Sequence, residues 1–537
     1  MRFLPALFVC TALAAPAVHA QRPPLTPHDS ALHALNRLAY GPRPGDVDRV
    51  AALGVMSWID LQLRPGQVPD PDVERRESGF PILDEDPATL ARAFAAVRQQ
   101  RIAARQGGAD SASPLGRRQP SPVDSQTALR VRRTMGQLQQ LAVMRAVRSE
   151  RQLQEVMVDF WTNHFNVFFG KGADRAFTPA YIERTIRPHA LGRFQDLLLA
   201  TAKSPAMLFY LDNWQSIAPG AESPALARMA RIDDARREQM LARLPQGLNE
   251  NYARELMELH TLGVDGGYTQ QDVIAVARIL TGWSIERPQQ GGGFRFNDWA
   301  HDYGEKTVRG VRFPAGHGMD EGVRLLQLLA QDPATMHHIS RQLCARFVSD
   351  DPPDGCVDAA VAAWSRSDGD IAEVLRAIFR SPEFWSPQAL RAKVKTPLEF
   401  IVSAVRATGG DPDTTPRLAQ VIGRLGEPLY GQPSPAGYPE SQQDWVNSGA
   451  LLLRMNMAVA LAAGRLPGVT IALDSLVPAT DDATALIETV DVRLLGGILT
   501  THTTDVLRRE VADVRDPVAA RALVIGLALG GPEFQRQ

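Results

Sequence analysis

Apolar and polar residues are arranged along this chain mainly with the spacing of helices. Apolar residues recur every three to four positions in many segments, for example from Ile371 to Phe379 and from Leu398 to Val405. Alternation with the period of a strand is confined to residues 294–296, 307–313 and 469–473. The pattern predicts an all-α (mostly α) fold, a large multi-helix globular domain with minor short β segments and loop insertions.

Helix starts are marked repeatedly by a capping side chain directly before proline. Proline is favoured at the first helical position because its missing N–H would have no partner there. These pairs are Asp86-Pro87, Thr178-Pro179, Ser204-Pro205, Asp332-Pro333, Ser381-Pro382 and Thr396-Pro397. Thr396 also fits a capping box with Glu399, as Thr269 does with Asp272. We expect a helix to begin at each of these places.

Residues 1–20 have the pattern of a secretory signal peptide. Arg2 is followed by an apolar run from Phe3 to Val18, and Val18-His19-Ala20 resembles a small-residue cleavage motif. We therefore predict cleavage near Ala20 and a periplasmic or secreted mature chain. No later segment offers ~18 uninterrupted apolar residues, so we expect a soluble mature chain without a membrane span.

Two stretches are predicted to be insertions in one large helical domain. Residues 106–126 are rich in Gly, Ser, Pro and Arg and are expected to be disordered. Residues 219–247 are polar and charged, and residues 426–443 form a loop rich in Pro and Gly. None of these stretches resembles a linker between autonomous domains. A two-lobed arrangement is the alternative.

Charge and cysteine content narrow the classes of partner and compartment. The formal net charge is -2, which argues against a nucleic-acid binder held by phosphate contacts. After cleavage only Cys344 and Cys356 would remain. A disulfide between them fits an oxidising compartment, and two buried thiols are the alternative.

The segment from Val158 to Phe169 is a first candidate for chemistry. If it is helical, one broad face carries His164 among aromatic residues. The opposite face carries Asp159, Thr162, Asn163 and Asn166. One interpretation of His164 is a core histidine that donates to a backbone carbonyl. The other is a pocket histidine that acts as a ligand or general base, because a buried imidazole can change charge near neutral pH.

The stretch from Asn249 to Trp283 reads as two helices joined by a Gly-marked turn. One face of the first helix carries Asn251, Arg254, Glu255 and Glu258. Two close carboxylates suit proton transfer or a hard metal ion. We therefore name Glu255, Glu258 and His164 as candidate catalytic residues. The alternative is an ordinary Arg254–Glu258 pair on a solvated face, worth only ~0.3–0.5 kcal/mol.

A polar cluster, His301-Asp302-Tyr303-Gly304-Glu305-Lys306, follows a Gly-rich turn. It is expected in a loop or short strand, where functional side chains are common. The candidate binding residues are Asn251, Arg254, His301, Asp302 and Lys306. The candidate metal ligands are Glu255, Glu258, His164 and His301. Because HExxH, G-x-S-x-G, P-loop and CxxC signatures are missing, the cofactor stays open, with a divalent metal as one option.

Several segments resemble a bacterial family catalogued as domain of unknown function 1800. They include HALNRLAYGPRPGDV from His33, DFWTNHFNVF from Asp159, NENYARELMELHTLGVDGGYTQQDVIAVARILTGW from Asn249, HDYGEKTVRG from His301 and GYPESQQDWVNSGALLLRMN from Gly437. Many relatives carry Trp where this chain has Tyr438. The resemblance implies an exported helical protein with a family-like domain over residues 21–465. Residues 466–537 would then be a C-terminal extension packed on that domain.

Three functions are compatible with these observations. The first is an envelope enzyme in which His164, Glu255, Glu258 and the His301 loop converge on a pocket, with or without a divalent metal. The second is a binding or accessory module, whose loop aromatics Trp283, Trp299, Tyr303, Tyr438 and Trp445 contact a sugar or a partner. The resemblance implies a companion exported protein similar to sulfatases and phosphatases as that partner. The third is a structural network of buried ion pairs.

Overall fold

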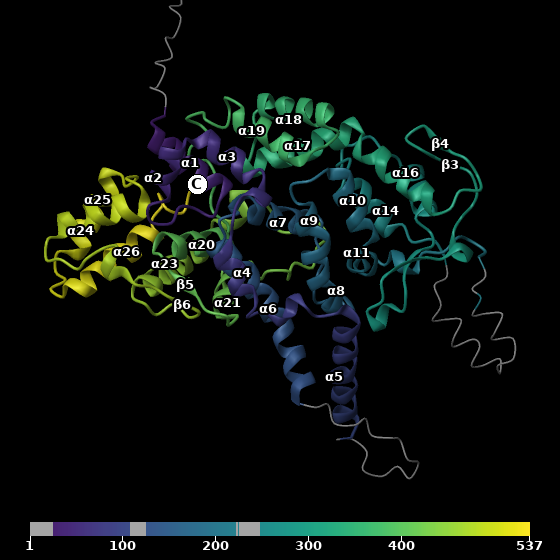
Figure 1. Ribbon diagram of the computed structural model, residues 1–537, viewed down its shortest axis with the longest axis horizontal. Helices are drawn as coiled ribbons and strands as arrows, with labels where there is room; N and C mark the ends of the chain where they lie inside the picture. The colour runs from purple at the N-terminus through teal and green to yellow at the C-terminus, as the bar shows by residue number, and fades with distance from the viewer. Residues whose placement is uncertain (1–24, 108–124, 222–223, 225–246) are drawn as a thin grey trace, which may run out of the picture.

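Helices make up most of the computed structural model (Figure 1), which describes all residues except 1–24, 108–124, 222–223 and 225–246. Within the described part, strands form three antiparallel pairs of two. The prediction of a mostly α fold with short β segments is confirmed. The predicted signal peptide and most of the insertions at 106–126 and 219–247 lie outside the described residues.

The first part of the chain, up to Tyr210, is helical. Its helices include α1 (Pro27–Leu38), α2 (Asp46–Leu53), α3 (Val55–Gln62), α4 (Pro71–Glu77), α5 (Pro87–Gly107), α6 (Ser125–Arg148), α7 (Gln152–His164), α8 (Asp174–Ala180), the π-helix η3 (Tyr181–Ile186), α9 (Arg187–His189), α10 (Phe194–Lys203) and α11 (Pro205–Tyr210). In Figure 1, α5 and α6 project together from the lower side of the molecule.

The middle of the chain carries two of the strand pairs. It contains α14 (Asn251–Glu258), α15 (Gln270–Ile279), β1 (Trp283–Ile285), β2 (Phe294–Phe296), β3 (Lys306–Val308), β4 (Val311–Phe313), α16 (Met319–Ala330), α17 (Pro333–Phe347), α18 (Asp354–Ser367) and α19 (Ile371–Arg380). β1 pairs with β2 and β3 with β4. A disulfide between Cys344 and Cys356 joins α17 to α18.

The last part of the chain packs beside the N-terminal helices (Figure 1). It contains α20 (Pro397–Ala407), β5 (Asp411–Pro412), α21 (Arg417–Arg424), α22 (Gln442–Trp445), α23 (Ser448–Ala462), β6 (Val469–Thr470), α24 (Ala483–Val490), the π-helix η8 (Asp491–Leu495), α25 (Thr501–Val511) and α26 (Pro517–Gly530). β5 pairs with β6. Among the described residues, no helix is long and apolar enough to cross a membrane.

The capping signals explain most of the predicted helix starts. Thr396 and Glu399 form the expected capping box at the start of α20, and Asp332 caps α17 by accepting from the backbone N–H of Ala334 at 2.9 Å. Two proline signals were misleading. Pro179 lies inside α8, and Ser381 follows the last residue of α19, with turns after it. A capping side chain before proline also suits a turn, so this signal alone does not separate the two.

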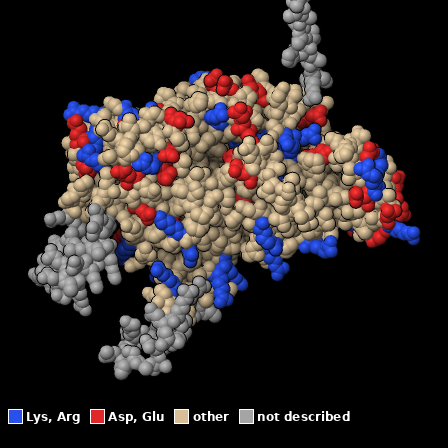
Figure 2. Space-filling view, turned by 180° about the vertical axis from the view of Figure 1, so that it is seen from behind, with Lys and Arg blue, Asp and Glu red and all other residues tan. Residues whose placement is uncertain are grey.

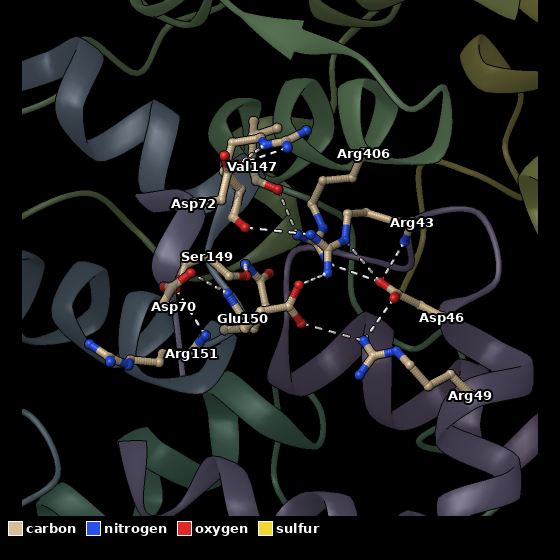
Figure 3. A network of polar contacts seen from close by, with 12 residues as sticks. Arg43, Asp46, Arg49, Asp70, Asp72, Val147, Ser149, Glu150, Arg151 and Arg406 are labelled. Atoms are coloured by element: carbon tan, nitrogen blue, oxygen red, sulfur yellow. Dashed lines mark hydrogen bonds and ion pairs between the residues drawn. The ribbon is translucent and has the colours of Figure 1, made fainter. Parts of the chain in front are cut away.

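One continuous hydrophobic core extends from Ala31 in α1 to Phe534 near the C-terminus. α26 packs closely on α23, because Gly526 has no side chain: a Cβ there would lie 2.8 Å from the Cα of Val459. A second contact joins α20 to the N-terminal helices. The buried Arg406 of α20 donates to the carbonyls of Gly41 at 2.7 Å and Val147 at 2.8 Å. It thereby ties α20 to the turn after α1 and to the end of α6 (Figure 3).

Candidate functional site

The predicted carboxylates of α14 do not form the ion pair that we considered as their alternative. Arg254 lies 3.6 Å from Glu250 and donates to Gln270 at 2.9 Å. Glu258 instead accepts from the hydroxyl of Tyr268 at 3.1 Å. Burial, and then the charge of Glu258, raise the pKa of Glu255. Asn251 is exposed, and its side chain donates to the carbonyl of Leu211 at 3.4 Å.

His164 lies in an aromatic environment at the end of α7. Its Nε2 is 3.3 Å from the carbonyl oxygen of His260, and its ring meets the Phe165 ring edge-on at 4.5 Å. Burial, and then the charge of His338, lower its pKa to about 3. Burial and His164 likewise lower the pKa of His260 to about 3. Both imidazoles are therefore neutral near pH 7, which is the state expected of core histidines.

The His301 loop forms a buried network of its own. The Nζ of Lys306 lies 2.7 Å from Glu321, and the Nε2 of His301 lies 3.4 Å from the same carboxylate oxygen. All three side chains are buried. Asp302 pairs with Arg278 at 2.7 Å. Glu321, which holds the cluster together, lies in α16 and was missed by the sequence analysis because nothing near it suggested a partner.

The candidate metal ligands do not assemble into a metal site. Within the described part of the chain, no group of three or more His, Cys, Asp or Glu side chains is placed to hold a metal ion. Glu255 and Glu258 lie on α14, His164 contacts His260, and His301 contacts Glu321. These residues therefore belong to separate local environments.

The polar face of α7 borders a small charged cavity, which we call the α7 cavity. Its volume is about 70 Å³. None of the predicted catalytic, binding or metal residues lines it. The lining side chains that carry or can carry charge are Tyr40, Arg145, Glu155, Asp159, Glu183, Arg187, Arg346, Glu427, Tyr430, Tyr438 and Glu440. They come from the turn after α1, from α6, α7, η3, α9 and α17, and from the loop between α21 and α22, so the fold collects them from distant parts of the sequence.

Asn163 of α7 and Asn166, just after the end of α7, fix that loop over the cavity. The side chain of Asn163 donates to the carbonyl of Tyr438 at 2.8 Å and accepts from its N–H at 2.6 Å. Asn166 donates to the carbonyls of Gln432 at 3.0 Å and Ser434 at 2.7 Å. Gly437 has φ +73°, and a Cβ there would lie 2.4 Å from the carbonyl oxygen of Asn163. Glycine is therefore required for this approach.

One wall of the α7 cavity is built from paired charges. Arg187 binds both carboxylate oxygens of Glu155, at 2.7 and 2.9 Å. Arg145 binds Glu183 at 2.7 Å, and Glu183 is presented by the π-helix η3. Burial acts to raise the pKa of Glu155, but Arg187, Arg145 and Arg151 together lower it further than burial raises it, so the pKa is lowered. Glu155 is therefore ionised at neutral pH.

The opposite side of the cavity holds Asp159 and Glu427, two carboxyl groups whose pKa values are raised. Burial raises the pKa of Asp159; Arg346 opposes this, while Glu440 and Glu399 add to it. Burial, and then the charge of Asp159, raise the pKa of Glu427. Because each carboxylate disfavours ionisation of the other, the pair retains a proton above the ordinary carboxyl range.

Arg346 and two polar atoms complete this side of the cavity. Arg346 lies 2.6 Å from Glu399 and 3.6 Å from Glu440. The Oε2 of Glu440 and the Oγ1 of Thr162 are buried and have no hydrogen-bond partner among the described residues. Leaving a buried polar atom without a hydrogen bond costs about 1–3 kcal/mol of folding free energy. A water molecule or a ligand that bonds to either atom would therefore be stabilised there.

The sequence contained a signal for this site. The polar face of α7, with Asp159, Thr162 and Asn163, was recognised as opposite to His164, but the histidine was preferred as the chemical group. Glu427 lies within the stretch 426–443, which was classified by its Pro and Gly content. No spacing in the sequence connects Asp159 to Glu427, because their proximity depends on how the loop folds onto α7.

Comparison with known proteins agrees with the resemblance seen in the sequence. The model of the family described as Protein of unknown function (DUF1800) matches residues 33–536, so the match includes the segment that we expected to be a C-terminal extension. No curated protein and no solved structure matches the chain. The α7 cavity, α14 and the His301 loop all lie within the matched region, and the chain therefore belongs to the DUF1800 family.

Proposed function

We propose that this protein is an exported enzyme that uses the α7 cavity for general acid–base catalysis. The proposal rests on two carboxyl groups that line the cavity, the half-buried Asp159 and the buried Glu427, whose pKa values are both raised. Carboxyl groups held protonated near neutral pH are found at sites of proton transfer. Asp159 and Glu427 replace His164, Glu255 and Glu258 as the residues that we expect to carry the reaction.

The chemistry that fits this arrangement is hydrolysis. A volume of about 70 Å³ admits a few water molecules or one small polar group, since one water needs about 10–15 Å³ by this measure. The ionised member of the pair would take a proton from a water molecule while the oxygen of that water attacks the substrate. The protonated member would give its proton to the leaving oxygen, so that the proton count is conserved. Arg346 would stabilise negative charge that develops on the substrate.

The proposal of export has two supports. Residues 1–20 carry the pattern of a signal peptide, and a disulfide joins Cys344 to Cys356. Disulfides persist in oxidising compartments such as the periplasm. A substrate in the cell envelope follows from this location. Because the cavity is small, an envelope polymer could not enter it whole. Only a narrow side group of such a substrate, carrying the bond to be hydrolysed, would reach the cavity.

An accessory role beside a companion hydrolase-like exported protein is a second proposal. Tyr303 favours it, because 42% of its surface is exposed on the loop after the β1–β2 pair. Trp283 is fully buried and Trp445 nearly so. Tyr303 is therefore the residue that we would replace first when testing binding of a companion protein.

Isosteric substitutions test the catalytic proposal. We would measure hydrolysis of chromogenic esters, glycosides, phosphate monoesters and sulfate esters by the mature protein and by its Asp159→Asn and Glu427→Gln variants. Turnover of one class should fall by about 10²–10⁴-fold in each variant. Asp48→Asn removes an exposed carboxylate outside the cavity and is the matched control. Full activity in both cavity variants, or no turnover of any class by the parent, would contradict the proposal.

The same variants separate catalysis from a purely structural network. A protonated carboxyl contributes no ion pair, so Asp159→Asn should leave the free energy of unfolding nearly unchanged near pH 4 and should not lower it at neutral pH. If the cavity served only to hold helices together, that substitution would instead cost several kcal/mol, as expected when one partner of a buried pair is removed.

A further inference from the structure

The projecting pair α5 and α6 is basic and contains no acidic residue. Each helix contains several arginines, and neither contains Lys, Asp or Glu. Three of these arginines are neutralised near the body of the protein: Arg130 by Glu85, Arg145 by Glu77 and Glu183, and Arg148 by Asp72. Among the side chains of this pair that the structure describes, Arg92, Arg98, Arg132 and Arg133 make no ion pair with a carboxylate. Figure 2 shows basic side chains along the lower edge of the molecule, from which this pair projects.

A groove of about 1090 Å³ lies between α5, α6 and α8. Its apolar lining includes Phe94, Val97 and Val131, and its charged lining consists of Arg98, Arg132 and Arg175. These three guanidinium groups are exposed and make no ion pair with a carboxylate in the part of the chain that the structure describes. No acidic side chain lines the groove. The surface therefore combines an apolar floor with charge of one sign.

Apolar side chains are also exposed beside these arginines. Ile102 is 44% exposed on α5, and Leu129 is 42% exposed on α6. Isolated exposed apolar residues are common on protein surfaces, but here they lie on the same projecting pair as the unpaired arginines. Arginine beside exposed aliphatic residues is the combination by which helices lie in the interface of an anionic bilayer.

We propose that α5, α6 and the groove beside them bind the surface of a membrane rich in anionic phospholipid. The lipid phosphates would accept from Arg98, Arg132 and Arg175, while Ile102 and Leu129 would enter the boundary between headgroups and acyl chains. A nucleic acid is the weaker alternative, because an apolar groove floor offers nothing to a sugar–phosphate backbone. The inference is independent of the α7 cavity, which none of these five residues lines.

Binding to vesicles tests the proposal directly. Co-sedimentation would compare vesicles of phosphatidylcholine alone with vesicles that also contain phosphatidylglycerol. We expect binding only to the anionic vesicles, and weaker binding as salt rises from about 0.1 to about 0.5 M. The triple variant Arg98→Gln, Arg132→Gln and Arg175→Gln should bind roughly 100-fold more weakly, since each basic side chain near an anionic surface contributes about 1 kcal/mol. Ile102→Ser should also weaken binding, without changing its salt dependence.

A triple variant elsewhere controls for total charge. Arg366→Gln, Arg493→Gln and Arg509→Gln remove three exposed arginines outside the groove and should bind vesicles as the parent does. Thermal unfolding would show that both triple variants remain folded. Equal binding to neutral and anionic vesicles, no binding to either, or equal binding by the groove variant would overturn the proposal. Binding of a DNA duplex as tightly as vesicles would also overturn it, by revealing a general polyanion surface.

Discussion

At the scale of single residues, the carboxyl groups that line the α7 cavity or contact its arginines fall into two populations. Glu155 and Glu399 each contact a guanidinium group, and despite burial their pKa values are lowered by Arg187 and Arg346 respectively. Glu427 is also buried and Asp159 is half-buried, but each faces other carboxylates, and their pKa values are raised. Carboxyl groups at this cavity are therefore ionised where a guanidinium group contacts them, and they retain a proton to higher pH where they face other carboxylates.

The raised pKa of Asp159 predicts a specific dependence of stability on pH. Its folded pKa lies above its ordinary value of 3.8, so the folded state binds more protons than the unfolded state. The free energy of unfolding must then fall as pH rises from about 4 through the folded pKa, by up to about 1.4 kcal/mol per pH unit for this group. Asp159→Asn should remove that slope. Urea unfolding of the parent and of Asp159→Asn from about pH 4 to about pH 8 would measure this slope. If the difference in stability between the two proteins were constant with pH, the prediction would be contradicted.

Glu399 should respond in the opposite way to Asp159. Glu399→Gln removes the partner of the buried Arg346, whose guanidinium lies 2.6 Å away, and we expect a loss of about 3–5 kcal/mol. At neutral pH Asp159→Asn should cost far less. Denaturant unfolding of both variants at one pH checks the contrast. Equal losses would mean that Asp159 is an ordinary ion-pair partner.

The sequence predicted the faces of α7 but did not select the residues that line the candidate site. The helical period placed Asp159, Asn163 and His164 on their correct faces of α7. The choice between the faces could not be made, because burial by a distant loop decides which polar group is unusual. Histidine was preferred because its ordinary pKa is near neutral. In the structure burial lowers the pKa of His164 to about 3, while burial raises that of Asp159.

At the scale of elements, the contact between α7 and the loop from Gly426 to Gln443 determines the shape of the cavity. Local signals predicted the helices well where a cap is made within one turn, as at Thr396 and Thr269. They did not predict the π-helix η3, because its extra residue per turn has no signature in the helical period. They also did not predict the contact with the loop, which depends on hydrogen bonds between residues more than 260 positions apart.

Gly437 is the position at which this element contact is most sensitive. Gly437→Ala would place a Cβ 2.4 Å from the carbonyl oxygen of Asn163, at a φ of +73°. We expect a loss of about 1–3 kcal/mol from the strained backbone conformation, together with displacement of Tyr438 and Glu440. Gly449→Ala is the control: its Cβ would meet its nearest neighbour at 3.4 Å, and alanine in α23 should be stabilising by about 0.5–1 kcal/mol. Thermal unfolding of both variants tests the pair of predictions, and a neutral Gly437→Ala would refute the steric argument.

The disulfide between Cys344 and Cys356 is a covalent link between two helices. It links α17, which carries Arg346, to α18 across a sequence separation of 12. Cys344→Ser with Cys356→Ser should lower the free energy of unfolding by about 2–4 kcal/mol. Denaturant unfolding of the oxidised parent and of the double variant measures the loss. A reducing agent should destabilise the parent and leave the variant unchanged; an effect on both would point to another cause.

At the scale of the whole molecule, the C-terminus is part of the support for the α7 cavity. Lys393 and Gln537 exchange backbone hydrogen bonds at 3.3 and 2.9 Å, and the N–H of Lys395 donates to the carbonyl of Gln535 at 2.9 Å. These residues directly precede Thr396, where α20 begins and the cavity lining is reached. The segment after residue 465 is therefore connected to the site by the backbone, besides sharing its hydrophobic core.

Removing residues 534–537 should consequently destabilise the whole chain and not only its end. Loss of the three backbone hydrogen bonds to Lys393 and Lys395, of the bond from Gln535 to Gly531, and of the buried Phe534 is expected to cost about 3 kcal/mol or more. Arg536→Ala is the matched control, because the side chain of Arg536 is exposed and its replacement keeps those backbone bonds. Calorimetry should show one transition for the parent, moved to lower temperature in the deletion variant and unmoved in the control. Two separate transitions, with only one of them sensitive to the deletion, would instead show that the C-terminal helices unfold independently of the cavity.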